Sequence, residues 1–122
     1  MMLLEISRIA DPGDYQKERM VLKATADVDV GGYAIFRSVR TANDLPSTQI
    51  TDTFWFDDKS VKAGDKVVVY SRHGATSQRL LPSGSTAHFY YWGRPEALWP
   101  VGGAHIAVLV LTSDWTTFEP PK

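Results

Sequence analysis

The 122-residue sequence contains no cysteine. This excludes a disulfide framework, a thiolate nucleophile and zinc or iron–sulfur sites held by cysteine. An excess of charge of one sign is also missing, because 13 basic residues face 14 acidic ones and the formal net charge is -1. That balance argues against nucleic acid or an anionic membrane surface as a partner.

Long hydrophobic runs are missing as well. The longest, Ile106 to Leu111, falls far short of the roughly 18 apolar residues that a membrane span needs. At the start of the chain, Glu5 and Arg8 interrupt the apolar residues before they reach the length of a secretory signal. We therefore expect no membrane segment and a cytoplasmic location.

The sequence does contain short runs in which every second residue is apolar, separated by glycine, proline, aspartate and asparagine. This pattern indicates half-buried strands, and no segment has a sustained helical stripe. Strands are expected at 3–9, 19–24, 33–39, 51–56, 66–71, 86–92 and 104–111. The pattern predicts an all-β fold, an antiparallel β-sandwich of about seven to nine strands. We expect one domain over residues 1–118 and a loose tail at 119–122, because Pro120 and Pro121 cannot continue a strand.

Alternation also predicts which side chains form the core between the two sheets. The expected core residues are Leu4, Ile6, Met20, Leu22, Ile35, Phe54, Phe56, Val67, Val69, Phe89, Tyr91, Ile106 and Val108. The polar stretch Arg72 to Ser85 is expected to be a loop. The last strand has apolar residues on both faces, so it is either central in its sheet or part of a homodimer interface.

Three stretches carry a family resemblance. They are Glu18 to Lys23 followed by Val28-Asp29-Val30-Gly31-Gly32-Tyr33; Phe54-Trp55-Phe56 followed by Val61 to Tyr70; and Tyr91-Trp92-Gly93 followed by Leu98-Trp99, Gly102-Gly103-Ala104 and Ile106 to Leu109. In this order they resemble the motifs E-x-V-x-L, V-D-L-S-G-W, F-x-F with L-x-P-G-x-x-L-x-V-Y, and L-x-W-G with V-W-N-N-x-G-D-x-A-x-L. These are motifs of the lamin tail domain family, immunoglobulin-like sandwiches found in nuclear lamins and many bacterial proteins.

Several positions in these stretches are expected to be structural. Gly32, Gly64 and Gly103 suit backbone that needs a positive φ or a close approach. Trp92 and Trp99 are expected to close one end of the sandwich, where a large apolar surface is buried.

The resemblance implies an interaction module without catalytic residues. We therefore expect a non-enzymatic protein-binding domain without cofactor or metal, whose partner is another protein. The candidate partner-binding residues are Trp55, Arg72, Tyr90 and Arg94, because tryptophan, tyrosine and arginine dominate interface hot spots. Two alternatives stay open: an immunity-type protein that neutralises a toxin enzyme, and a sandwich that binds a carbohydrate or other ligand.

The histidines and aspartates do not have the spacing of a known metal site. His73 is expected in a solvated loop, and His88 and His105 at outward strand positions. The carboxylates near strand ends are interpreted as a solvated acidic rim. They are Asp52, Asp57, Asp58 and Asp65.

Overall fold

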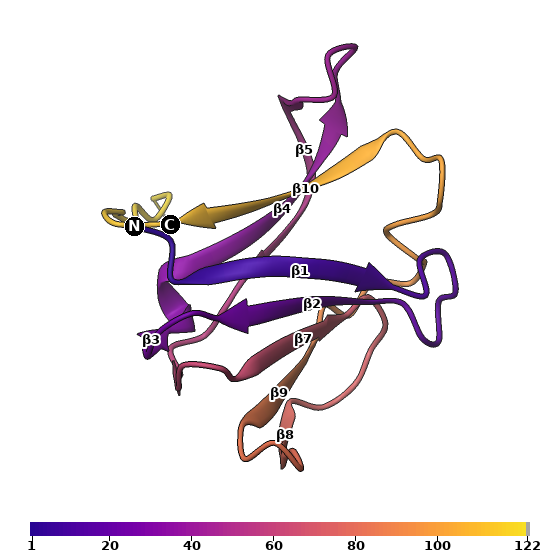
Figure 1. Ribbon diagram of the computed structural model, residues 1–122. Coiled ribbons are helices and arrows are strands. Elements are labelled where there is room, and N and C mark those ends of the chain that lie inside the picture. The colour runs from indigo at the N-terminus through magenta and orange to yellow at the C-terminus, as the bar shows by residue number, and fades with distance from the viewer. Residues whose placement is uncertain (122) are drawn as a thin grey trace.

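A computed structural model describes residues 1–121, and within this range the chain is all-β (Figure 1). The strands are β1 (Leu4–Ala10), β2 (Arg19–Ala24), β3 (Val28–Asp29), β4 (Tyr33–Arg40), β5 (Pro46–Trp55), β6 (Ser60–Val61), β7 (Lys66–Tyr70), β8 (Ser77–Leu80), β9 (Thr86–Tyr91) and β10 (His105–Leu111). A single turn of 3-10 helix, Val30–Gly32, leads into β4. No helix in this part of the chain is long and apolar enough to cross a membrane.

The strands form a five-stranded sheet of order β1-β2-β7-β9-β8 and a three-stranded sheet of order β10-β4-β5; β3 and β6 form a short third sheet. In Figure 1 the three-stranded sheet forms a second layer, drawn above the five-stranded one. The predicted all-β sandwich is confirmed, with ten strands rather than seven to nine. One pair, β7 with β9, is parallel, and the chain makes this crossover through β8 at the sheet edge without a helix.

The core lies between the two larger sheets. Of the predicted core residues, Leu4, Met20, Leu22, Ile35, Phe56, Val67 and Val69 are buried, and Ile6 and Phe54 pack against them half-buried. The predicted faces of the last two long strands are wrong. In β9 the buried residues are Ala87, His88 and Tyr90 rather than Phe89 and Tyr91, and in β10 the core is contacted by Ala107 and Leu109 rather than Ile106 and Val108.

Several segments differ from the predicted boundaries. Strand β5 begins at Pro46, inside an expected loop, where the buried Ser38 hydroxyl donates to the Ser47 carbonyl at 2.8 Å. The predicted loop Arg72 to Ser85 contains β8. After β10 the chain has no further strand up to residue 121. Of the predicted tail 119–122, Lys122 lies outside the described residues.

Trp92 and Trp99 pack as predicted at one end of the core, with ring centroids 6.2 Å apart. Among the predicted structural glycines, Gly64 has a φ of +88°, which L side chains rarely adopt. Gly103 approaches the Pro100 carbonyl so closely that a Cβ would lie 3.0 Å from its oxygen. The expectation for Gly32 is wrong, because it has neither a positive φ nor a close neighbour.

Candidate interaction surface

The outer face of the three-stranded sheet carries an exposed pair of tryptophans. Trp55 is the last residue of β5. Because neighbouring side chains of a strand point to opposite faces and Phe54 packs against the core, the Trp55 ring points outward. Trp115, from the segment after β10, meets it edge to face with ring centroids 5.0 Å apart and an interplanar angle of 85°. The indole Nε1 of Trp55 donates to the Gly31 carbonyl at 3.2 Å, which fixes its ring. The two side chains nevertheless remain 46% and 64% exposed.

This pair, called here the tryptophan ridge, lines two hollows of different character. One hollow, of about 230 Å³, is floored by Ala34 and Phe36 of β4, with Thr53 and Thr112 at its sides. Among residues 1–121, no charged side chain lines it. The other, of about 280 Å³, runs from the ridge past Gly31 to two carboxylates, Asp57 and Asp58. An apolar hollow and an acidic hollow therefore share the same aromatic pair as part of their lining.

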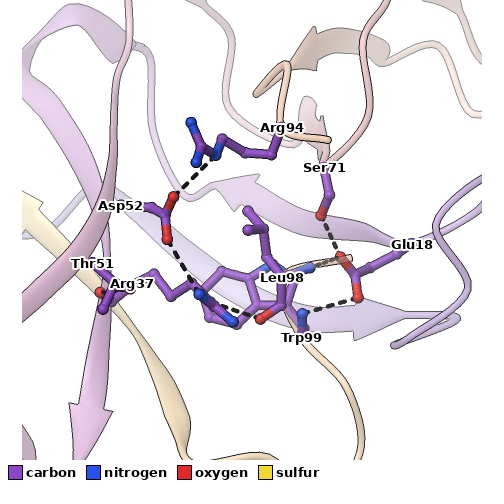
Figure 2. Close-up of polar contacts among 8 residues, drawn as sticks. All are labelled: Glu18, Arg37, Thr51, Asp52, Ser71, Arg94, Leu98 and Trp99. Carbon is purple, nitrogen blue, oxygen red and sulfur yellow. Dashed lines mark hydrogen bonds and ion pairs between the residues drawn. The ribbon is translucent and has the colours of Figure 1, made fainter. Parts of the chain in front are cut away.

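Arg94 belongs to a different part of the surface (Figure 2). Its Nε lies 3.0 Å from Asp52 Oδ1, while Arg37 Nη1 lies 3.2 Å from Asp52 Oδ2. Arg37 also donates from Nε to the Leu98 carbonyl at 2.8 Å. The Asp52 side chain is only 7% exposed, so its predicted place in a solvated rim is wrong. Arg94 is about half exposed, but its charge is already paired with this buried carboxylate.

Glu18 contacts the loop between β9 and β10, the same loop that contains Arg94. The sequence pattern suggested no role for it. Its side chain is fully buried and accepts from the backbone N–H group of Gly13. It also accepts from the N–H groups of Leu98 and Trp99 and from the Ser71 hydroxyl (Figure 2). These contacts tie the loop between β9 and β10 to the start of β2. The only sequence signal was its place in the first lamin-tail-like stretch, which says nothing about burial.

Arg72 is held against its own sheet. Its guanidinium carbon lies 4.9 Å from the ring centre of Tyr70 and 5.1 Å from that of Tyr91. It also donates to the backbone carbonyls of Gln16 and His73, at 3.1 and 3.0 Å. The side chain is half-buried, and its contacts within the chain explain its position without a partner.

Tyr90 does not reach the surface, so the prediction that it contacts a partner is wrong. It is 5% exposed and packs edge to face with Phe56 at 5.1 Å. Burial raises the pKa of its hydroxyl, and the nearby Asp57 and Asp29 add to that shift. The hydroxyl has no hydrogen-bond partner among the described residues. The error follows from the reversed faces of β9.

The same reversal buries His88, which was expected to point outward. Its Nε2 lies 2.9 Å from Asp65 Oδ2, and this carboxylate also accepts from the Lys62 and Thr86 N–H groups. Burial by itself raises the pKa of Asp65, but these hydrogen bonds outweigh it and hold the pKa below its usual value. Asp65 is therefore a buried residue whose hydrogen bonds link the turn before β7 to β9. Its expected place in a solvated rim is wrong.

His73 is exposed as predicted, and His105 is half-buried on β10. Over residues 1–121 no three histidine, aspartate or glutamate side chains converge into a group that could hold a metal ion. Of the four candidate partner-binding residues, Trp55 and Arg94 are both exposed and both line a hollow. The guanidinium of Arg94 is already paired with Asp52, whereas the exposed ring of Trp55 packs against another exposed ring. Its neighbour, Trp115, is not among those four residues.

No protein-family model matches the chain, and no curated protein matches it significantly. The lamin-tail resemblance and the immunity-type role therefore stay predictions.

Proposed function

We propose that this chain is a non-enzymatic protein-interaction module whose docking site is the tryptophan ridge with its two hollows. The observation that carries the proposal is the pair of exposed, mutually packed tryptophans beside a hollow that no charged residue of the described range 1–121 lines. Tryptophans of this kind dominate hot spots, because they bury a large area with few rotatable bonds. The hydrogen bond from Trp55 to Gly31 lowers the entropy lost on binding, since the ring is already oriented.

The two hollows define the chemistry of the partner. The hollow over Ala34 and Phe36 fits an apolar side chain. The hollow beside Asp57 and Asp58 fits a basic one, which gains both carboxylate attraction and the negative face of an indole ring. The partner is therefore a protein segment that presents an apolar and a basic side chain next to each other.

A non-enzymatic role is supported by how the buried polar groups are used. Glu18 is occupied by backbone N–H groups and the Ser71 hydroxyl, Asp65 by backbone N–H groups and His88, and Asp52 by two arginines. Each of these carboxylates already has its partners within the fold. None of these three buried carboxylates is free to act as a general base.

A sugar-binding role is the alternative that the exposed tryptophans also suggest. Two rings at 85° do not form the flat platform on which a sugar chain stacks, which favours a protein partner. Tryptophan fluorescence across a glycan panel tests the alternative directly, because Trp55 and Trp115 would both report a bound sugar.

The test compares three tagged baits in lysate treated with nuclease: the wild-type chain, Trp115→Ala and Phe118→Ala. Phe118 is the matched control, since it is an aromatic residue of the same segment that is 91% exposed. A protein retained stoichiometrically by the wild type is then purified and titrated against each variant. We expect Trp115→Ala to weaken binding at least about thirtyfold, or ~2 kcal/mol, and Phe118→Ala to leave it unchanged.

A second variant, Asp57→Asn, tests the acidic hollow. It should weaken binding and make the affinity less sensitive to salt, because one charge is removed from the contact. Equal binding by the wild type and Trp115→Ala, or no stoichiometric protein partner at all, would refute the proposal.

A further inference from the structure

Strand β10 is an edge strand whose apolar residues are incompletely covered. It lies at the outside of the order β10-β4-β5, and its sequence is His-Ile-Ala-Val-Leu-Val-Leu. Six of its seven residues are half-buried, one is exposed and none is buried. Buried strands elsewhere in the fold have similar sequences, Val67, Val68 and Val69 of β7 for example, but they lie between two neighbours. The composition of β10 is that of a central strand.

The backbone of β10 is also half used. The N–H groups of Arg40 and Thr112 bond to the carbonyls of Ala104 and Gly32, which sets the phase of the ladder with β4. In antiparallel pairing, the backbone groups of alternate residues bond to the same neighbouring strand. The N–H and C=O groups of the even-numbered residues of β10 therefore point toward β4. The N–H and C=O groups of Ala107, Leu109 and Leu111 point away from it. At the start of the strand, the His105 carbonyl accepts a long 3.4 Å bond from the Arg40 side chain.

The other three edges of the two larger sheets carry the features that prevent strand pairing. β1 has a register shift between Ile6 and Arg8 and an exposed charge at Glu5. β5 begins with a proline and has two register shifts against β4. β8 is four residues long, fully exposed and carries Arg79. Charges, prolines, bulges and short length are how proteins protect edges, and β10 has none of them.

We propose that two copies of this chain associate by antiparallel pairing of β10 with β10 about a two-fold axis at Val108. This register overlaps the whole strand, and it places the unpaired backbone groups of one copy opposite those of the other. Ala107 faces Leu109 of the second copy, and His105 faces Leu111. On the outer face, Val108 meets its own counterpart and Ile106 meets Val110, so that the cross-strand pairs are β-branched, which favours sheet pairing.

A second copy fits this edge better than an unrelated strand, because the edge is complementary to itself. The strand carries no permanent charge, so the two-fold axis brings no like charges together. Burial and the nearby Arg37 lower the pKa of its one ionisable residue, His105, which is therefore uncharged at neutral pH. The pairing does not use the tryptophan ridge, because Trp55 lies on β5 at the opposite edge of the sheet and Trp115 packs against Trp55.

Val108→Lys tests the pairing, with Thr53→Lys as the matched control. Val108, Phe36 and Thr53 lie in one cross-strand row on the outer face, so each variant adds one lysine to the same face. Only the lysine at position 108 would meet a second lysine across the axis. Sedimentation velocity at several concentrations measures the dimer, and circular dichroism measures the fold of each variant.

We expect a concentration-dependent dimer for the wild type and for Thr53→Lys, and at least about a tenfold larger dissociation constant for Val108→Lys. Mixing Val108→Lys with Val108→Glu should restore a mixed dimer, because opposite charges then face each other. This mixing experiment also identifies a variant that is folded but unable to pair with itself. A wild-type monomer up to about millimolar concentration, or equal disruption by both lysine variants, would overturn the proposal.

Discussion

Replacing Glu18 by glutamine tests the buried contacts that hold the loop between β9 and β10. The two carboxylate oxygens share four donors. Oε1 accepts from Gly13 N–H at 2.8 Å and Trp99 N–H at 3.0 Å, and Oε2 accepts from Leu98 N–H at 2.8 Å and the Ser71 hydroxyl. A glutamine has one oxygen and one NH₂ group. In either orientation the NH₂ group therefore faces at least one backbone N–H that cannot turn away.

The magnitude follows from the number of hydrogen bonds lost. A hydrogen bond to a charged group is worth about 1.5–3 kcal/mol, and a buried donor left without a partner is penalised further. Glu18→Gln loses one or two such bonds, depending on the orientation of its amide, while removal of the buried charge returns part of the loss. We expect the free energy of unfolding to fall by about 3 kcal/mol, which is a large share of the 5–15 kcal/mol typical of a domain.

Urea titration followed by tryptophan fluorescence measures this change, because Trp99 is itself one of the contacts. Glu5→Gln is the control. It makes the same chemical change at an exposed position of β1 and should alter the free energy of unfolding by less than about 0.5 kcal/mol. A loss below about 1 kcal/mol for Glu18→Gln, with an unchanged denaturant m value, would refute the reasoning.

Two further substitutions test contacts elsewhere in the fold. The pKa of Asp65 is held below its usual value, so its carboxylate stabilises the fold above the unfolded-state pKa of about 3.9, and this stability is lost as the pH falls through the folded-state pKa. Asp65→Asn should therefore flatten the fall in unfolding free energy below about pH 4 in urea titrations, and an unchanged acid slope would contradict this assignment. Gly31→Ala should lower the melting temperature, because an added Cβ would lie 2.8 Å from the Cα of Asp58. Gly32→Ala, whose Cβ would meet nothing closer than 3.9 Å, is its control, and equal melting temperatures would contradict the argument.

Strand positions could be predicted where turn residues and alternation agree. The predicted strand 19–24 has the same bounds as β2. Met20 and Leu22 of β2 and Val67 and Val69 of β7 face the core as expected. Gly64 could also be predicted, because a turn between strands requires a residue that tolerates a positive φ. These features depend on neighbours in the sequence, which is why the sequence alone is enough.

The faces of β9 could not be predicted, because Phe89, Tyr90 and Tyr91 are all aromatic and alternation is lost. The structure selects Tyr90 for the core, where it packs against Phe54 and Phe56, and His88 follows because it shares the same face. The burial of His88 is compensated by Asp65, a residue 23 positions earlier in the chain. Hydropathy carries no information about such a partner.

Only part of the candidate site could be predicted, because its second half depends on a contact between residues far apart in the chain. Trp55 could be predicted to face outward because Phe54 and Phe56 occupy the other face of its strand. Its contact with Trp115 is made by a segment without regular structure, for which no periodicity exists. The ridge therefore emerges only when the chain after β10 is placed against the sheet.

The two proposed surfaces are geometrically compatible. Antiparallel pairing through β10 joins the two three-stranded sheets into one continuous sheet, and its two-fold axis stands perpendicular to that sheet. Each Trp55 lies at the far edge of the joined sheet, and both ridges face the same side. The dimer would then present two docking sites to one partner surface, and binding at the second site would be intramolecular. A partner with two suitable segments would therefore bind the wild-type dimer more tightly than it binds the Val108→Lys variant, whose dimer is weakened. The difference would arise even though Val108 lies outside the ridge.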